Sequence, residues 1–311
     1  MIANDVLLAT QERLDDIMLL AGSQASLAVR QVQTLQTLGD AEFKVFSQWG
    51  EDGIIEWLVS RMPEIPASFV EFGVQSYCES NTRFLTCHRN WRGLIMDCSA
   101  EYMENLRKSP LYWRHDLTAV TAFVDRENIN GLIRNNGYAG DLGILSVDID
   151  STDYWVWEAI TAVNPWIVIA EYNAVFGDLR ALTIPYTPVF DRTTAHSSGL
   201  YWGASIGALT QLADKKGYSL LGTNRAGCNA FFVRNDLLPL FDGAVLDRLP
   251  RPSLYRESRS ADGSLTHVAG IARRDVIADV VLVDVLTGQM LKMADAGEIY
   301  SDRWKTAMGK K

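Results

Sequence analysis

The stretch SFVEFGVQSYCESNTR, residues 68–83, decides the fold. Its apolar residues Phe69, Val70 and Phe72 predict a buried strand, which ends at Gly73. A strand that runs through a glycine into a polar turn is typical of the first turn of a nucleotide-binding α/β domain. This turn lacks the second and third glycines of a dinucleotide site, where the backbone approaches a pyrophosphate.

Strand and helix patterns alternate downstream of this turn, which predicts a doubly wound, mostly parallel, Rossmann-like α/β sheet of seven strands. Only six residues, 224–229, separate the last two strands. A parallel crossover needs a longer connection, so these strands should form an antiparallel edge hairpin. The predicted strands are 68–74, 93–98, 111–116, 142–149, 166–172, 218–223 and 230–234, and the predicted helices are 79–90, 100–108, 120–135, 153–163 and 203–216.

The two ends of the chain differ from this core. Residues 2–38 repeat apolar side chains at helical spacing, and Gly22-Ser23 predicts a break into two helices. These N-terminal helices would pack on the domain or form a homodimer with a second copy. The polar tail contains two turn motifs, Asp262-Gly263 and Thr287-Gly288, which predict hairpins. The predicted division is an N-terminal helical segment 1–45, a main domain 46–245 and a C-terminal extension 246–311.

Composition excludes several classes of partner. The chain of 311 residues is 48% hydrophobic and carries a net charge of −9, which argues against nucleic-acid binding. Its four cysteines form no CxxC pair, so we expect buried thiols in a reducing, cytoplasmic setting and no zinc site. Asp15 and Asp16 interrupt the first apolar stretch, which predicts no signal peptide, and no run is long enough to span a membrane.

Acidic residues follow five of the predicted strands at their carboxyl ends, where doubly wound sheets bind ligands. Like charges on one rim repel, so a bound group should offset them. Asp97, after the second strand, suits the two hydroxyls of a ribose, although this segment could instead cap the next helix at Ser99. The acids at these ends are Glu71, Asp97, Asp116, Asp148 with Asp150, and Glu171.

The missing glycines argue against a pyrophosphate and favour a nucleoside that lacks phosphate. S-adenosylmethionine is such a ligand. Its adenosine would lie over Gly73 and Asp97, and its amino-acid end near Glu71 and the helix that begins around Ser80. His115, beside Asp116, is expected near the adenine.

Several ordered motifs resemble the FkbM-like S-adenosylmethionine-dependent methyltransferases over residues 46–235. They are SQWGED at 47–52, EFG at 71–73, SNT at 80–82 and WRGL at 91–94. The resemblance implies a class I methyltransferase fold and a sugar hydroxyl as the methyl acceptor. The fourth strand ends in SVDIDSTDYWVW, where the family commonly has Lys-x-Asp-x-Glu-Gly. The predicted cofactor-binding residues are Gln48, Glu71, Gly73, Ser76, Asn81, Thr82, Asp97, Asp116 and Asp148.

Methyl transfer to a hydroxyl needs a group that removes a proton, a metal ion, or both. Asp148 and Asp150 are the predicted catalytic carboxylates. Asp148, Glu171 and Asn173 offer oxygen ligands suited to Mg²⁺ and resemble the ligand set of metal-dependent O-methyltransferases. Two other roles stay open: Asp150 or Ser151 could cap the next helix, and Asp148 could bind the cofactor's ammonium group.

His196 lies in a polar loop after the fifth strand and is the predicted histidine base, with an exposed loop histidine as the alternative. The predicted acceptor-binding aromatics are Tyr154, Tyr201 and Trp202, whose faces suit a sugar ring. Three functions remain: an O-methyltransferase acting on a sugar of a glycan, glycolipid or glycosylated metabolite; a nicotinamide-dependent oxidoreductase; and a non-catalytic glycan- or partner-binding protein.

Overall fold

The computed structural model describes residues 2–309. Seven strands form the main sheet and three form a smaller one. The strands are β1 (Ser68–Phe72), β2 (Arg92–Asp97), β3 (Leu117–Thr121), β4 (Gly140–Val147), β5 (Val163–Glu171), β6 (Leu182–Thr183), β7 (Tyr218–Thr223), β8 (Asn229–Arg234), β9 (Val281–Asp284) and β10 (Gln289–Lys292).

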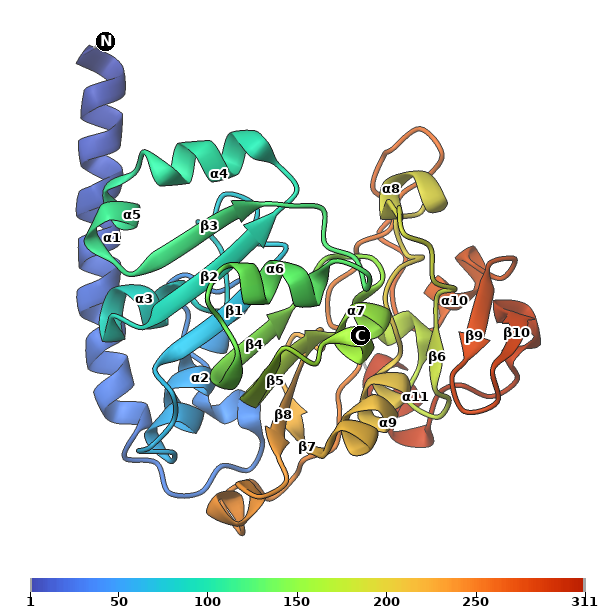
Figure 1. Ribbon diagram of the computed structural model, residues 1–311. Helices are drawn as coiled ribbons and strands as arrows, with labels where there is room; N and C mark the ends of the chain where they lie inside the picture. The colour runs from blue at the N-terminus through green and yellow to red at the C-terminus, as the bar shows by residue number, and fades with distance from the viewer. Residues whose placement is uncertain (1, 310–311) are drawn as a thin grey trace.

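Helices cover both faces of the main sheet (Figure 1). The α-helices are α1 (Ile2–Val29), α2 (Glu51–Ser60), α3 (Arg83–Arg89), α4 (Ala100–Arg107), α5 (Pro110–Arg114), α6 (Ile129–Asn135), α7 (Asp153–Ala159), α8 (Arg192–Ala195), α9 (Ile206–Lys216), α10 (Ala272–Val276) and α11 (Asp302–Gly309). The 3-10 helices are η1 (Leu38–Ala41), η2 (Ala174–Phe176), η3 (Leu238–Phe241) and η4 (Met293–Ala296).

The strand order of the main sheet is β3-β2-β1-β4-β5-β8-β7. The first five are parallel to one another, and β8 is antiparallel to both β5 and β7. The predicted Rossmann-like sheet and its antiparallel hairpin are therefore confirmed. The chain order reverses between β1 and β4, and in such sheets that reversal opens a crevice beyond the carboxyl ends of the strands.

Alternate residues of the central strands enter two cores. Phe69 of β1 packs in the core that contains α2 and α4, whereas Val70 and Phe72 pack in the core that contains α6, α7 and α9. Successive side chains of a strand point to opposite faces of the sheet. A strand that is buried on both faces therefore needs apolar side chains at successive positions, which is why these strands are continuous apolar runs in the sequence.

Two sequence predictions about elements are wrong. Residues 111–116 do not form a strand, because the turn of helix α5 occupies Pro110–Arg114 and the third strand starts at Leu117. Pro110 stands at the first helical position, where its missing N–H costs nothing. The N-terminal segment is one helix, not two: α1 runs through Gly22 to Val29.

Gly22 marks close packing instead of a break. A Cβ at this position would lie 2.4 Å from Cγ2 of Val45 and 2.8 Å from Cε2 of Phe84. The glycine lets α1 approach these residues while it continues as a helix. In Figure 1 the helix lies along one edge of the molecule, and its first turns extend past the other elements.

The tail packs on the main domain. Its Ile277, Leu282, Met293 and Trp304 belong to the same core as α7 and α9. Strands β9 and β10 form the expected hairpin at Thr287-Gly288, and β9 also pairs with β6 to complete the small sheet. The other expected turn, at Asp262-Gly263, is closed by an antiparallel bridge between Arg259 and Leu265. Within residues 2–309, the structure contains no helix long and apolar enough to cross a membrane.

Candidate active site

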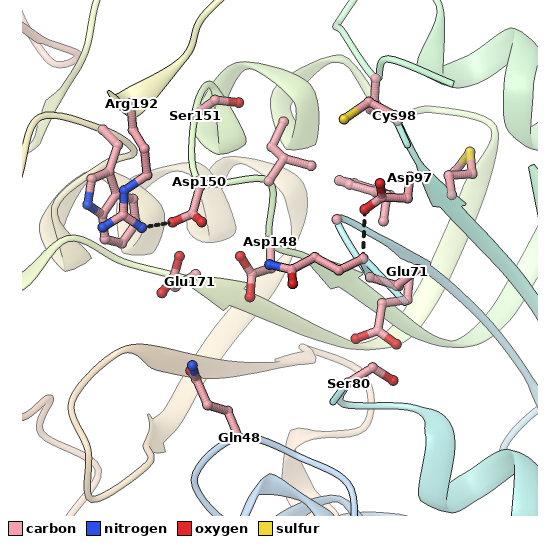
Figure 2. Close-up of a pocket in the computed structure, with 18 of the residues that line it drawn as sticks. Gln48, Glu71, Ser80, Asp97, Cys98, Asp148, Asp150, Ser151, Glu171 and Arg192 are labelled. Carbon is pink, nitrogen blue, oxygen red and sulfur yellow. Dashed lines mark hydrogen bonds and ion pairs between the residues drawn. The ribbon is translucent and has the colours of Figure 1, made fainter. Parts of the chain in front are cut away.

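A cavity of about 690 Å³ opens at the carboxyl ends of β1, β2, β4 and β5, at the reversal of strand order. Its two halves differ in the elements that build them (Figure 2). The first half contains the ends of β1, β2 and β3, with Glu71, Gly73 and Asp97. The second contains the ends of β4 and β5, the segment 190–193, and residues of the tail.

Gly73 is required by the neighbouring strand. Its φ is +82°, and a Cβ there would lie 1.6 Å from the carbonyl oxygen of Asp148. The close approach seen in the sequence is thus between the turn after β1 and the end of β4. No pyrophosphate is needed to explain this glycine.

Glu71 holds the end of the turn between β1 and α3 in place. Its carboxylate accepts hydrogen bonds from the backbone N–H of Asn81 (2.9 Å) and of Thr82 (3.2 Å), and from the hydroxyls of Thr82 and Ser146. Burial raises its pKa above the ordinary value. Asn81 lines the cavity, whereas Thr82 donates to Glu71 and is not among the lining residues, so its predicted contact with a cofactor is not supported by its position.

Asp97 stands at the edge of the cavity with spare acceptor capacity. Its Oδ2 accepts from the backbone N–H of Gln75 at 2.7 Å, and its Oδ1 from that of Ser99 at 2.8 Å. The side chain of Ser99 accepts from the N–H of Tyr102 and caps α4, so the capping role belongs to Ser99. Each carboxylate oxygen can accept a second bond, which leaves Asp97 able to bind two hydroxyls.

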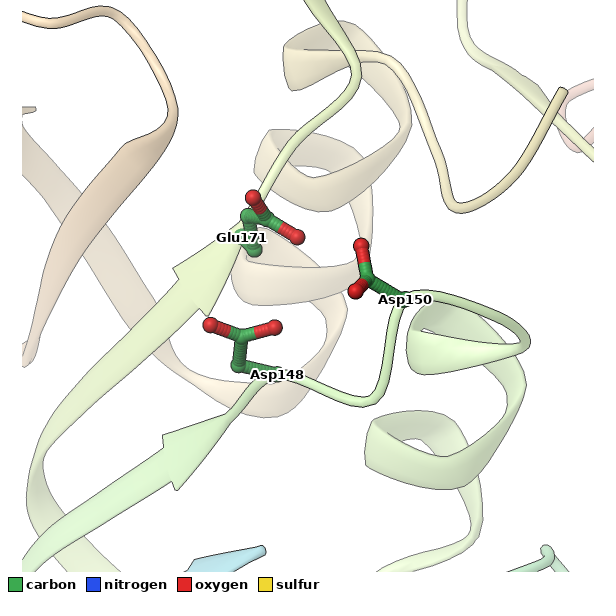
Figure 3. A group of neighbouring side chains, drawn as sticks. All are labelled: Asp148, Asp150 and Glu171. Atoms are coloured by element: carbon green, nitrogen blue, oxygen red, sulfur yellow. The ribbon is translucent and has the colours of Figure 1, made fainter. Parts of the chain in front are cut away.

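Three carboxylates meet at the ends of β4 and β5, as Figure 3 shows. Asp148, Asp150 and Glu171 each offer an oxygen, and these oxygens all lie within 4.8 Å of one another. Burial, together with the negative charge of Asp150, raises the pKa of Asp148 well above its usual range. Burial and the charge of Asp148 do the same to the pKa of Glu171, whose Oε2 is buried without a hydrogen-bond partner.

Neither Asp150 nor Ser151 caps α7, because the N-cap residue is Thr152, which makes no side-chain capping bond. Asp153, in the first turn of α7, accepts from the backbone N–H of Ile149 at 2.8 Å and of Ser151 at 3.0 Å. Burial raises the pKa of Asp153 to about 6. Asp150, with φ at +54°, is held in the left-handed region and presents its carboxylate to the cluster.

Asn173 does not belong to this cluster, which corrects the predicted ligand set. Its Oδ1 accepts from the N–H of Val175, and its Nδ2 donates to the carbonyl oxygens of Leu200 and Trp202. The amide therefore organises the backbone after β5, and Asn173 is not among the described residues that line the cavity. Asp150 takes its place beside Asp148 and Glu171.

Arg192, on α8, joins three segments around the second half of the cavity (Figure 2). It pairs with Asp150, donates to Glu257 at 3.2 Å and donates to the carbonyl oxygen of Gly199 at 3.1 Å. Its guanidinium lies 5.1 Å from the ring centroid of Trp202, which also lines the cavity. Trp202, predicted to contact the acceptor, therefore lies in the wall of the cavity.

Two aromatic rings stack at another part of the wall. Trp49, from the loop before α2, and Tyr255, from the tail, have ring centroids 5.8 Å apart and planes 13° apart. Gln48, a predicted cofactor-binding residue, also lines the cavity. Stacked aromatic faces suit the apolar face of a sugar ring.

Several predicted site residues lie elsewhere. His196 Nδ1 lies 2.8 Å from the hydroxyl of Ser198, its Nε2 lies 3.8 Å from Asp279, and it does not line the cavity. Tyr154 is buried in the core, and the hydroxyl of Tyr201 donates to the carbonyl oxygen of Val281 at 2.7 Å. These positions do not support a base at His196 or an acceptor contact at either tyrosine.

Asp116 and Ser76 are also outside the lining residues. Asp116 precedes β3, so it lies at the amino end of a parallel strand, opposite the cavity, and pairs weakly with Arg92 at 3.8 Å. The error follows from placing the third strand too early. Its true carboxyl end brings Ala122, Phe123 and Val124 to the cavity. His115, likewise, bonds to Asn90 at 3.0 Å.

Sequence reasoning missed Arg192, Asn229, Tyr255 and Glu257, all of which line the cavity. Arg192 and Glu257 carry no motif, and their pairing depends on how α8 and the tail fold over the sheet. Asn229 could have been found from its position, because it begins the strand that pairs with β5 in the antiparallel sense. The prediction considered only the carboxyl ends of parallel strands. Of the cysteines, only Cys228 is buried as expected, while Cys78 and Cys98 are exposed.

Comparison with solved structures finds methyltransferases. The N-terminal domain of EvdMO1, with SAH bound, is 10% identical and matches 61% of this chain and 82% of its own, with a TM-score of 0.39. An S-adenosylmethionine-dependent methyltransferase from Clostridium acetobutylicum ATCC 824 is 10% identical over 59% of this chain and 90% of its own, with a TM-score of 0.38.

An O-methyltransferase from Bacillus cereus, in complex with SAH, is 13% identical over 72% of this chain and 95% of its own, with a TM-score of 0.37. Identities and TM-scores this low support no conclusion about activity, and the fold is assigned from the sheet order itself. No family model matches the chain, and no curated protein matches it.

Proposed function

We propose that this chain is an S-adenosylmethionine-dependent O-methyltransferase that acts on a sugar hydroxyl of a glycan, glycolipid or glycosylated metabolite. One observation carries the proposal: a single cavity at the reversal of strand order joins Asp97, which has free acceptor sites, to the carboxylates of Asp148, Asp150 and Glu171. The FkbM-like motifs remain the support for sugar as the acceptor class.

The first half of the cavity fits the cofactor. Asp97 would accept the ribose hydroxyls, and the turn from Gly73 to Gln75 would lie against the nucleoside. Ala122 and Phe123 lie at the end of β3, where they would contact the adenine. When bound, S-adenosylmethionine supplies an electrophilic methyl group, so the protein has only to align the acceptor and remove its proton.

The second half fits the proton transfer. A sugar hydroxyl is a weak acid, and its proton needs an acceptor at hydrogen-bond distance. The raised pKa of Asp148 and of Glu171 makes each a stronger base once ionised, because burial destabilises the carboxylate relative to its protonated form. We assign proton removal to this pair, with Asp150 as their charged neighbour.

Mg²⁺ would fit the same three carboxylates. Hard cations prefer oxygen ligands, and a cation would offset the repulsion that raises the pKa of Asp148 and Glu171. The ion would lower the pKa of a coordinated hydroxyl. Arg192 already pairs with Asp150, which supplies part of the same compensation. Turnover that is unchanged in excess chelator would remove the metal from the proposal.

The test is calorimetric titration of S-adenosylmethionine into the purified protein, with and without Mg²⁺, and with NAD as the control. We expect S-adenosylmethionine to bind and NAD not to bind, because the turn at Gly73 lacks the other glycines of a dinucleotide site. Binding of NAD alone would favour the oxidoreductase. Binding of neither would favour a non-catalytic protein that keeps this fold.

A further inference from the structure

The floor of the cavity contains two oxygen atoms without a hydrogen-bond partner among the residues that the structure describes. One is Oδ1 of Asn229, a residue only 5% exposed, and the other is Oε2 of Glu171. Both residues line the cavity. They lie directly opposite each other in the antiparallel pair β5–β8, so their side chains share one face of the sheet. Unpaired buried acceptors are costly unless a ligand donates to them.

The orientation of the Asn229 amide is fixed by its other end. Its Nδ2 donates to Oε1 of Glu51 at 3.0 Å, and the same oxygen accepts from Nδ2 of Asn224 at 2.6 Å. The second oxygen of Glu51 accepts from the backbone N–H groups of Trp49 and Gly50. Both oxygens of Glu51 accept hydrogen bonds, so the amide nitrogen of Asn229 faces Glu51 as a donor and its amide oxygen faces away.

The charges in this half of the cavity disfavour an anion. Five carboxylates line it: Asp148, Asp150, Glu171, Asp191 and Glu257. Among the described lining residues, Arg192 is the one cation, and it is already paired with Asp150 and Glu257. Without a bound metal ion, a phosphate or a carboxylate placed here would find no unpaired cation among the described lining residues and would lie against carboxyl oxygens.

We propose that the acceptor carries no anionic group and binds through a hydroxyl or amino group that donates to Asn229 Oδ1. This inference rests on the proposed function and narrows its substrate class to neutral or amine-bearing sugars. Sugar phosphates, nucleotide-activated sugars and uronic acids are excluded. Any activating phosphate must therefore be removed, by glycosyl transfer or by hydrolysis, before the sugar reaches this protein.

Selectivity is tested with matched sugars on protein saturated with S-adenosylhomocysteine. Methyl glucoside, glucosamine, glucose 6-phosphate and glucuronic acid share a ring and differ in charge. Saturation-transfer NMR should detect binding of methyl glucoside and glucosamine. The two anions should bind at least about tenfold more weakly, which is the scale of one unfavourable contact of about 1.4 kcal/mol. Equal or tighter binding of either anion, or no binding of the two uncharged or cationic probes, overturns the proposal.

Two variants localise the effect. Asn229→Ala should weaken the binding of glucosamine and of methyl glucoside about tenfold and leave the affinity for S-adenosylhomocysteine unchanged. Glu257→Lys places a positive charge at an exposed position on the rim of the cavity and should allow glucose 6-phosphate to bind. Asp116→Lys makes the same charge change outside the cavity and should not allow it to bind. Equal effects of the two lysine variants would contradict a local charge filter.

The proposed function and this inference fail separately. If the unmodified protein does not bind S-adenosylhomocysteine, the methyltransferase proposal fails, whichever sugars bind. If S-adenosylhomocysteine binds normally and the Asn229→Ala protein keeps full affinity for the neutral sugars, only the acceptor assignment fails. Thermal unfolding of each variant shows whether loss of binding reflects loss of the fold.

Discussion

At the scale of single residues, a substitution at Asp97 tests cofactor binding separately from the stability of the fold. Replacement by alanine removes the oxygens predicted to bind the ribose. We expect Asp97→Ala to weaken S-adenosylmethionine binding by about 1–3 kcal/mol, the range for hydrogen bonds to a charged group. Calorimetric titration measures the loss.

Ser99→Ala is the matched control for Asp97→Ala, because Ser99 caps α4 and is not among the described residues that line the cavity. It should lower the free energy of unfolding by about 1 kcal/mol and leave cofactor affinity unchanged. If Asp97→Ala instead lowers stability and preserves affinity, the carboxylate only holds the turn at Gln75.

Asp52 gives a prediction about pH. It is buried, it accepts from the backbone N–H groups of Val45, Phe46 and Ser47 through Oδ2, and its Oδ1 has no partner. Burial raises its pKa from 3.8 to about 6. Because the folded pKa lies above the unfolded one, the protonated form stabilises the fold below pH 4, and this contribution is lost as the pH rises through 6.

The shift corresponds to roughly 3 kcal/mol, from about 1.4 kcal/mol per pKa unit. Asp52→Asn keeps an acceptor oxygen for the three N–H groups and cannot titrate. Relative to this variant, the unmodified protein should lose stability between about pH 4 and pH 6 in urea unfolding. Parallel pH profiles for the two proteins would show that Asp52 stays ionised at low pH and that its three hydrogen bonds dominate its burial.

At the scale of elements, Arg192 makes the ion pairs that link α8 to the rest of the molecule. Arg192 links this helix to Asp150 after β4 and to Glu257 in the tail. We expect Arg192→Ala to lower local stability by about 1–3 kcal/mol, the range for hydrogen bonds to charged groups. Hydrogen exchange of residues 190–200 should accelerate, while exchange in β4 and β5 stays slow.

The control for that experiment is Arg225→Ala, which breaks an exposed pair with Asp40, and neither residue is in α8 or among the described residues that line the cavity. Its effect on residues 190–200 should be absent. An unchanged exchange rate at α8 in the Arg192 variant would mean that backbone contacts, such as that of Asn173 with Leu200, are sufficient to hold this wall.

At the scale of the whole molecule, α1 has an apolar surface that the described part of the chain leaves exposed. Leu14, Ile17, Leu20 and Leu27 are between 48% and 66% exposed. We expect a second copy to cover this surface and form a homodimer. Light scattering should give twice the 34.7 kDa mass of one chain.

Ile17→Asp should return the protein to a monomer, because it places a charge in the middle of the exposed apolar surface of α1. Leu265→Asp, an equally drastic change at an exposed position of the tail, is the control and should remain a dimer. A monomeric unmodified protein at micromolar concentration would show that α1 serves only its own chain.

Local sequence patterns were sufficient to predict most of the sheet and one half of the site. Local patterns placed β1, β2, β4, β5 and the final hairpin, because buried parallel strands must be apolar on both faces and six residues cannot make a parallel crossover. Glu71, Gly73 and Asp97 were predictable for the same reason, since each lies at or next to the carboxyl end of a recognised strand.

The acceptor half of the site depends on tertiary packing. Asp148 and Glu171 were expected together, but the replacement of Asn173 by Asp150 depends on backbone N–H and C=O groups that the Asn173 amide must satisfy. Arg192, Asn229, Tyr255 and Glu257 come from segments far apart in the chain, and no local pattern encodes their meeting. Their positions follow from the packing of α8 and the tail over the sheet, which is a property of the complete core.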